Sequence, residues 1–589
     1  MYDAFDLVFF LGALVAVLLV GFFTTRHQEA SVSGYFRGGN RLPWYAIGFS
    51  IIAAGISSEQ FVGEMGYAYK LGMPVVNWEW LVFPSLTVLL WVFVPIYVRN
   101  RITTMPEYLE RRFGGQARTL YAYLTVASYV FVNFALVFYT GGFALERMWH
   151  IHRIAAVWLL AAVTGLYTVY GGLTAVAWTS SLQCVLLMGG GIYLFFAGMA
   201  RIGWDFQAMI GTGQHAHLAT TADHEVPWTA LVMLALSTNI WYYATNQYIN
   251  QRCLAARDEW HAKMGVLLAG GLQVLMPLAT CFPGMIYRVI NPGLDDANAA
   301  YPDVVAAVVP AGLRGLIAAA IVGAIMSTIS GLVNSTSTLV TLDIFQRGPG
   351  RHWPEERLVR FGRWSGGIAL LIGALFAPIV MKWESLFRYA QDLWAPMAAP
   401  VVVVFLAAAL WKGAGSRGAV ACLWLAILSV PFTLTRAMLA DHGIHFLTFL
   451  VTKAKEVLVG AGFQSLPEFS SDNLENPMVL AGAVGLASWV LMAALTDRRP
   501  LGRGLMFALA GCIPIVVVAA ISPVAIAVLV CVTMIVFMLA GAAARSTRLD
   551  ALWDLSMLRT RPGGPWYASL WLWWLVFAAS LGALYLYFW

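Results

Sequence analysis

Residues 53–60 of this chain read Ala-Ala-Gly-Ile-Ser-Ser-Glu-Gln, and they lie inside an apolar segment from about Leu42 to Tyr69. As a straight helix this segment would span ~40 Å, which is enough to cross a bilayer. A carboxylate, an amide and two hydroxyls at membrane depth are costly unless they line a protein-enclosed cavity or bind a ligand. The sequence therefore predicts a functional site at this polar run.

The composition identifies the class of protein around that run. The chain has 589 residues, of which 60% are hydrophobic and only 11% are charged, and this excludes a soluble globular domain of the same length. The net charge of +6 comes from basic residues spread over loops rather than gathered on one patch, so nucleic acid is not an expected partner. We predict an all-α polytopic membrane protein whose surroundings are the lipid bilayer.

Apolar windows punctuated by Gly, Pro and charges predict sixteen membrane spans. They lie near 5–24, 43–69, 77–98, 119–146, 154–171, 174–200, 228–250, 263–289, 310–342, 359–381, 387–411, 418–438, 477–496, 504–521, 523–543 and 566–588. The pair around Ser522-Pro523 is either a tight hairpin or one kinked segment. The segment 440–476 is expected to be an outer loop.

The distribution of basic residues predicts the orientation. If the N-terminus lies outside and the loops alternate, most Lys and Arg fall on the inner side, as the positive-inside rule requires. We therefore expect an integral protein of the plasma or inner membrane with both termini outside.

Polar residues recur at helical spacing on three of the predicted spans. The second span carries Ala53, Ser57, Gln60 and Glu64, the seventh carries Asn239, Tyr242, Tyr243 and Asn246, and the ninth carries Ser327, Gly331, Asn334 and Thr338 with Thr328 beside them. Glu79 stands between Trp78 and Trp80 at the start of the third span. Such stripes are often sites of close helix packing, and aromatic residues near span ends are often interfacial. Several of them on separate spans nevertheless favour a central polar cavity.

The donor and acceptor types in these stripes limit the ligands. Hydroxyl oxygens and backbone carbonyls freed by a helix broken at Ala53–Gly55 suit a small hard cation. Amides, a carboxylate and tyrosines suit a polyhydroxylated neutral solute, whose hydroxyls both donate and accept and whose C–H face stacks on a ring. The acids lack a nucleophile–base pair or a metal cluster, so the chain is not expected to be an enzyme.

A set of ordered motifs resembles the sodium/solute symporters, and most closely their sodium/sugar cotransporter branch. The resemblance covers residues 1–440 and the last span. Its marks are the run Gly171–Thr179 (GGLTAVAWT), Asn334–Thr338 leading to Asp343-Ile344, Thr104–Tyr108 with Arg112–Gly115, Asn246-Gln247 through Gln251-Arg252, and Ala300–Pro302.

The resemblance implies a LeuT-like core of two inverted five-helix repeats with additional N- and C-terminal helices. The corresponding divisions are 1–42, 43–200 (first repeat), 201–227 (outer loop), 228–411 (second repeat) and 412–589. It also implies a sodium site shared by the second and ninth spans. The expected ligands are the carbonyls of Ala53, Ile56 and Ala324 and the hydroxyls of Ser327 and Thr328.

For a sugar, the resemblance implies hydrogen-bonding roles for Gln60, Glu79, Asn239 and Gln391, with Gln273 in the same region. Tyr242 would be the stacking inner gate with Tyr243 beside it, and Phe387 with Trp78 would close the outer side. The chain departs from the family pattern at four positions. Gln273 replaces a lysine of the bacterial sugar members, Gly55 an asparagine, Glu64 an apolar gate residue and Ser180 an acidic residue.

The predicted function is sodium-driven sugar symport by alternating access, with Na⁺ as the coupling ion and no organic cofactor. One alternative is the same fold carrying inositol, a carboxylate or an amino acid. Coupling to protons is another, since Glu59 and Glu64 are available. A more remote alternative is a sodium-gated solute sensor or channel.

Overall fold

The computed structural model describes residues 4–25, 31–221, 234–380, 386–440, 552–558 and 566–589, with single positions between 221 and 234 and between 483 and 496. Regular secondary structure in these ranges is entirely helical, apart from an isolated bridge between Leu42 and Ala256. Side chains of residues 386–392 are not described, nor is the predicted outer loop 440–476.

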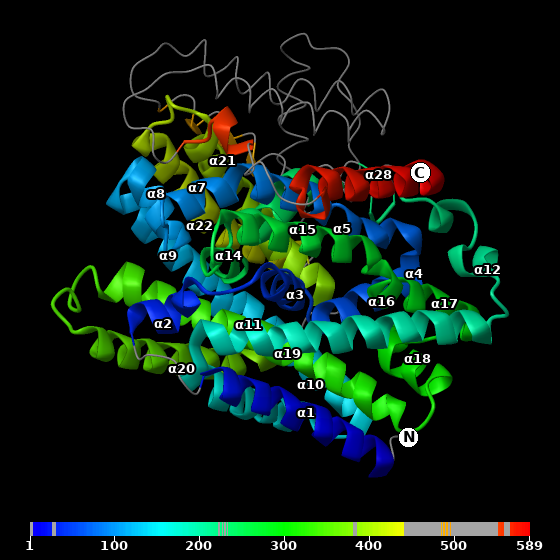
Figure 1. The fold of residues 1–589 in the computed structure, drawn as a ribbon. Coiled ribbons are helices and arrows are strands. Elements are labelled where there is room, and N and C mark those ends of the chain that lie inside the picture. Colours follow the sequence, from blue (N-terminus) through cyan, green and yellow to red (C-terminus); the bar gives the residue numbers. More distant parts are fainter. Residues whose placement is uncertain are drawn as a thin grey trace, which may run out of the picture.

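Long helices cross the molecule in roughly parallel layers, with shorter helices at their ends (Figure 1). The long ones are α1 (Ala4–Thr25), α9 (Gly115–Ser128), α10 (Phe134–Trp149), α11 (Arg153–Arg201), α15 (Glu259–Leu275), α19 (Leu313–Thr338), α20 (Glu355–Val380), α21 (Leu386–Leu410), α22 (Ser416–Ala440) and α28 (Leu570–Phe588). The shorter ones are α2 (Val32–Arg37), α3 (Trp44–Gly55), α4 (Met65–Leu71), α5 (Asn77–Trp80), α6 (Val82–Val88), α7 (Val94–Arg99), α8 (Met105–Phe113), α12 (Phe206–Ile210), α14 (Gln247–Leu254), α16 (Pro277–Thr280), α17 (Phe282–Ile290) and α18 (Ala300–Val308).

Nine helical stretches within the described residues are long and apolar enough to cross a membrane, and two bent helix pairs raise the number to eleven. The predicted span 154–171 contains a shorter apolar helix, Arg153–Leu166. The span predicted at 228–250 contains the π-helical segments η7 (Leu234–Thr238) and η8 (Trp241–Thr245), is interrupted at Asn246 (φ −76°, ψ 132°) and continues as α14. The predicted spans near 504–521 and 523–543 lie outside the described residues, and the one near 477–496 largely does.

Helix α19 forms the centre of the bundle. It packs against α1, α3, α10, α11 and α20, and nearly all of its residues from Gly315 to Thr338 are buried. Small side chains along α19 allow this close approach, as they do in membrane helices generally. At Gly323, for example, an added Cβ would lie 3.0 Å from the Gln183 side chain.

The N-terminal helix α1 is joined to α19 by a buried carboxylate. Asp6 Oδ1 accepts hydrogen bonds from the backbone N–H groups of Gly312 (2.7 Å) and Gly315 (3.1 Å), at the beginning of α19. A carboxylate at a helix N-terminus satisfies free N–H groups and complements the helix dipole. The N-terminal helix therefore contributes directly to the position of the central helix.

The two halves of α11 meet at Gly172, within the motif Gly171–Thr179. Gly172 has φ +58° and ψ −164°, a backbone conformation that is nearly exclusive to glycine. An added Cβ would also lie 2.7 Å from the Tyr35 carbonyl oxygen of α2. Glycine here allows the chain to change direction between two predicted spans while α2 packs against the joint.

We predict that Gly172→Ala lowers the free energy of unfolding by about 1–3 kcal/mol, because alanine would be strained at this φ and would collide with Tyr35. Thermal unfolding in detergent measures the effect. Gly189→Ala, on the exposed face of the same helix with no atom within 4 Å of the added Cβ, is the control. Equal melting temperatures for the two variants would contradict this role of Gly172.

Candidate functional site

The second membrane-spanning segment is broken at the polar run. Helix α3 ends at Gly55, Ile56 is extended (φ −116°, ψ 122°), and the helix resumes at the π-helical segment η2 (Glu59–Glu64), which continues into α4. The two arms are bent by 55°. The sequence predicted a break at Ala53–Gly55, but Gly55 is still helical and the break falls at residues 56–57.

Gln60 bridges this break. Its Nε2 donates to the Gly55 carbonyl at 3.0 Å, and its Oε1 accepts from the Ser57 backbone N–H at 2.8 Å. The Ser57 N–H would otherwise be the helical donor to the carbonyl of Ala53. The Gln60 side chain thus replaces main-chain hydrogen bonds that the break removes, a role that its helical spacing did not indicate.

The predicted cation ligands lie at the end of α3 and on α19, two helices that pack against each other. Thr328 Oγ1 donates to the Ala54 carbonyl at 3.5 Å, which places the hydroxyl of α19 at the end of α3. Ser327 Oγ lies 2.6 Å from Ser180 Oγ on α11. The five residues predicted to bind the cation, and Ala54, are all buried and carry no charge. The five are Ala53, Ile56, Ala324, Ser327 and Thr328.

A cluster of aromatic rings lies beside the break. The hydroxyl of Tyr243 lies against Gly55, where an added Cβ would be only 2.8 Å away. Tyr243 contacts Tyr242 with ring centroids 5.1 Å apart, and Tyr242 contacts Trp394 at 5.8 Å. The hydroxyl of Tyr248 donates a hydrogen bond to the hydroxyl of Tyr242. Sequence reasoning missed Trp394, although it stands three residues after Gln391 on α21.

A second polar cluster forms at the other bent helix pair. Helices α15 and α16–α17 meet at an angle of 43°. Near this bend, Gln273 Nε2 donates to Glu79 Oε2, and Thr280 Oγ1 donates to Glu79 Oε1 at 3.2 Å. The neighbouring Cys281 Sγ donates to Glu64 Oε1 at 3.2 Å. Two residues predicted for the solute, Glu79 and Gln273, are therefore in direct contact.

The other residues predicted to bind the solute or to gate the site have few described contacts. Asn239 is buried between η7 and η8, and its Nδ2 has no hydrogen-bond partner among the described residues. Trp78 is half-buried and contacts Tyr67 edge-on, with ring centroids 6.2 Å apart. Gln391 and Phe387 lie on α21, but their side chains are outside the described set.

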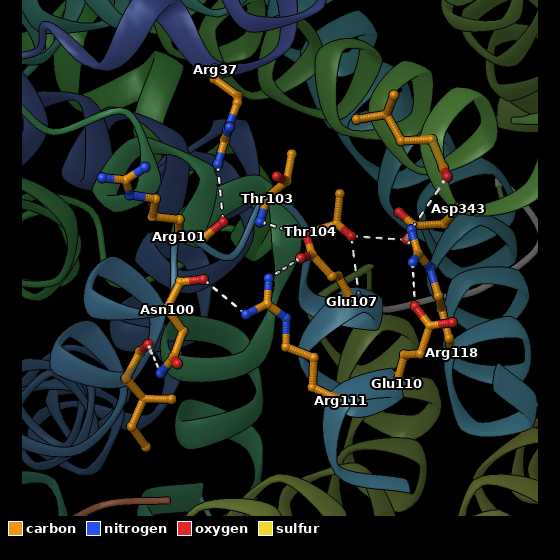
Figure 2. Close-up of polar contacts among 12 residues, drawn as sticks. Arg37, Asn100, Arg101, Thr103, Thr104, Glu107, Glu110, Arg111, Arg118 and Asp343 are labelled. Atoms are coloured by element: carbon orange, nitrogen blue, oxygen red, sulfur yellow. Dashed lines mark hydrogen bonds and ion pairs between the residues drawn. The ribbon is translucent and has the colours of Figure 1, made fainter. Parts of the chain in front are cut away.

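A charged network lies at the ends of α8, α9 and α19 (Figure 2). Asp343, in the π-helical segment η10 (Leu339–Phe345), accepts from Thr104 Oγ1 at 2.8 Å and from Arg118 Nε at 2.6 Å. Arg118 also pairs with Glu110 at 2.5 Å, and Arg347 pairs with the same carboxylate. We call these five residues the Asp343 network. It joins helices that belong to different predicted repeats.

An opening of about 510 Å³ lies beside the Asp343 network. Four arginines and two carboxylates line it, namely Arg37, Arg118, Arg347, Arg351, Glu107 and Glu355. This end of the bundle is therefore both strongly charged and accessible.

Two spans broken in their middle, with buried polar groups at both breaks, define a class of protein. Discontinuous membrane helices that expose main-chain groups to a central site are the arrangement of secondary transporters. Residues 35–426 match the sodium:solute symporter family, and the chain belongs to that family.

The relatives of known type are transporters. A sodium/glucose cotransporter of Vibrio parahaemolyticus is 31% identical over 461 residues, which cover 73% of this chain and 84% of the relative. A sodium/myo-inositol cotransporter 2 of Mus musculus is 32% identical, covering 70% and 67%. The sodium/glucose cotransporter 4 of the same organism is 32% identical, and the match spans 66% of its length.

The solved structure of a Na⁺-coupled sialic acid symporter in its outward-open state has a similar fold. Its TM-score is 0.62 at 22% identity, and the match covers 74% of this chain and 97% of that one. The fold class is thus the predicted one, an all-α polytopic membrane protein built on two inverted five-helix repeats with additional helices. Within the family, sodium is the coupling ion and a small solute is the substrate.

Burial makes Arg118 the critical cation of the Asp343 network. The side chains of Arg118 and Asp343 are 8% and 0% exposed. Arg118→Gln should therefore lower the free energy of unfolding by about 3–5 kcal/mol, because it leaves a buried carboxylate unpaired. Chemical unfolding in detergent measures this. Arg111→Gln is the control, since Arg111 is 40% exposed and its ion pair with Glu107 is expected to contribute about 1 kcal/mol or less. A smaller loss for the Arg118 variant than for the control would contradict the assignment.

Proposed function

We propose that this chain transports a sugar or a similar polyol together with sodium, by alternating access. The observation that carries the proposal is the meeting of three groups at the end of α3: the Ala54 carbonyl, the hydroxyl of Thr328 and the hydroxyl of Tyr243 beside Gly55. Glu79 and Gln273 lie beyond them at the second bend. An ion site and a hydrogen-bonding site for a neutral solute would then share one broken segment.

The sodium ion binds, in this proposal, between α3 and α19. Its ligands are the carbonyls of Ala53, Ile56 and Ala324 and the hydroxyls of Ser327 and Thr328. The donor set fits because neutral oxygens suit a small hard cation. The contact between Thr328 Oγ1 and the Ala54 carbonyl supports the fit, since it already brings two such oxygens face to face. Ser180 offers a further neutral oxygen next to Ser327.

The solute binds on the other side of the break. Hydrogen-bonding groups from five positions are assigned to its hydroxyls, and one ring is assigned to its C–H face. The hydrogen-bonding groups are those of Gln60, Glu79, Asn239, Gln273 and Gln391. Tyr242 stacks on the solute with Tyr243 beside it, and Trp78 with Phe387 closes the outer side. The buried, unpartnered Nδ2 of Asn239 supports this, because an unpaired buried donor is costly until a ligand accepts from it.

Coupling follows from the position of Gln60. Because Gln60 bonds to both sides of the break, an ion that draws the carbonyls of α3 toward α19 also reorients the amide offered to the solute. Such linkage is reciprocal, so sodium and solute raise each other's affinity by the same factor.

The chain then consists of two inverted repeats, an outer loop and further helices. The first repeat occupies 43–200 and the second 228–411, with the outer loop 201–227 between them and further helices in 1–42 and 412–589. Both termini lie outside, and the Asp343 network lies at the inner face. The membrane is the plasma or inner membrane.

We predict that the double variant Ser327→Ala with Thr328→Ala reduces sodium-dependent uptake at least about tenfold, which corresponds to ~1.4 kcal/mol of lost sodium binding. The test measures uptake of labelled glucose and labelled myo-inositol into proteoliposomes with an inward sodium gradient. The matched control is Ser429→Ala with Thr433→Ala on α22, where both hydroxyls donate to carbonyls of their own helix. Uptake that does not depend on sodium, or an unchanged sodium response in the double variant, would overturn the sodium site.

The proposed stacking assigns the contact with the solute to the ring of Tyr242 and not to its hydroxyl. Tyr242→Phe should keep the apparent solute affinity within about threefold, whereas Tyr242→Ala should weaken it tenfold or more because ring contacts contribute about 1–3 kcal/mol. The sugar concentration at half-maximal uptake measures both effects. If the phenylalanine variant loses as much affinity as the alanine variant, the hydroxyl and not the ring carries the interaction.

A further inference from the structure

Glu64 and Glu79 form a pair of buried carboxyl groups in contact with each other. Their exposed fractions are 2% and 3%, and their side chains are within hydrogen-bonding contact. Two neighbouring side chains also link the carboxyls. Thr280 contacts Glu79, Cys281 contacts Glu64, and the Thr280 and Cys281 side chains are 3.6 Å apart.

The pair has more hydrogen-bond acceptors than donors. Four carboxyl oxygens and Gln273 Oε1 face three donor groups with four hydrogens, two on Gln273 Nε2 and one each on the Thr280 hydroxyl and the Cys281 thiol. Thr280 offers its single hydrogen to the Met276 carbonyl as well, also at 3.2 Å. Gln273 is 1% exposed, and its Oε1 has no partner among the described residues. An unpartnered buried acceptor beside two carboxyls indicates that this site lacks a hydrogen.

No lysine, arginine or histidine in the described part of the chain forms an ion pair with either carboxyl. Carboxylates only accept hydrogen bonds, so two of them contact each other favourably only if one carries a proton. Two adjacent negative charges at membrane depth would also be strongly disfavoured.

The groups that act on the pair come from several elements. Glu59 lies on the same segment η2, Cys281 lies between α16 and α17, and Tyr242 and Tyr243 lie on η8. Gln273 and Thr280 add neutral contacts from α15 and α16. Each of these groups is neutral or negative in its ordinary state, so none supplies a compensating charge. The side chains at 386–392 of α21, which also packs against η2, are outside the described set.

We propose that Glu64 and Glu79 hold one proton between them, and that the solute binds best while this proton is in place. The first part stands on the geometry of the pair alone. The second part rests on the proposed solute site, to which Glu79 belongs. Enclosing a solute removes water from the pair, and the loss of water penalises the doubly ionised form most.

Solute binding should weaken as the pH rises. When the pH rises far enough to remove the shared proton, solute binding must take a proton back up, and the apparent affinity falls by up to about tenfold per pH unit. Glu64→Gln imitates the protonated acid in shape and in its hydrogen-bonding group. The variant should therefore keep the affinity of the low-pH wild type and lose the pH dependence.

Infrared spectroscopy of the full chain in detergent tests the proton without any solute. The carbonyl stretch of a protonated carboxyl should be present near neutral pH in the wild type. A single shared proton predicts that Glu64→Gln and Glu79→Gln each remove the same absorption and that the double variant removes no more. Glu59→Gln, which removes a buried carboxyl from the same segment, should leave that absorption in place. Retention of the absorption in both single variants, or its absence from the wild type, would overturn the shared proton.

Uptake measurements test the second part with whichever of glucose and myo-inositol is transported. The expected result is a pH-dependent apparent affinity in the wild type and in Glu59→Gln, and a flat profile in Glu64→Gln. Parallel profiles in the wild type and Glu64→Gln, or loss of solute binding in a Glu64→Gln protein that still responds to sodium in thermal unfolding, would overturn it. If neither sugar is taken up, the proposed function fails, while the infrared result decides the shared proton separately.

Discussion

The break in the second span controls the rest of the site, because main-chain groups released inside a membrane must find partners within the protein. Gln60 satisfies the Gly55 carbonyl and the Ser57 N–H, and Thr328 reaches the Ala54 carbonyl. Each partner is a side chain with a proposed role toward the ion or the solute. The main-chain groups at the break therefore link α3 to Gln60 and to α19, at the place where both ligands are expected to bind.

Much of this arrangement could be predicted from the sequence, because polar groups in apolar helices are few and each requires a partner. Thr328 contacts Ala54, and Glu79 contacts Gln273, so residues that the family resemblance assigned to the ion and to the solute do meet partners across the bundle. The exact position of the break could not be predicted. Gly55 is a poor helix former in isolation, but here it ends a regular helix, and Ile56 and Ser57 directly after it leave the helix instead.

Other features depend on contacts between distant segments, which helical spacing does not encode. The prediction of one polar helix face assumed a continuous helix through Ala53, Ser57, Gln60 and Glu64, whereas the break separates these residues. As a result, Gln60 bonds within the break and Glu64 contacts Cys281 and Glu79. Gly55 is explained by its neighbour: the hydroxyl of Tyr243 fills the space that a larger side chain would need. Trp394 was missed because its partner Tyr242 lies about 150 residues away in the chain.

Two departures from the family pattern become a single observation when their places are compared. In the pattern that the resemblance implies for bacterial sugar members, residue 273 is a lysine and residue 64 is apolar. Relative to that pattern, Gln273 and Glu64 together make the surroundings of Glu79 more negative by two formal charges. A lysine at 273 would neutralise Glu79 directly, whereas Gln273 donates a neutral hydrogen bond. The compensating positive charge must then come from a proton or from a bound cation, and the contact between the two carboxyls favours a proton.

The positions of the two proposed sites on the bent segment have a mechanical consequence. Ala53 and Ile56, which are proposed to bind the ion, lie at the end of α3, while Glu64 lies at the end of η2, on the other arm of the 55° bend. Gln60 stands between them and is bonded to residues on both sides of the break. A change in the bend would therefore alter the ion ligands and the carboxyl pair together. Because any such linkage acts in both directions, a shared proton at Glu64 and Glu79 should influence sodium affinity as well as solute affinity.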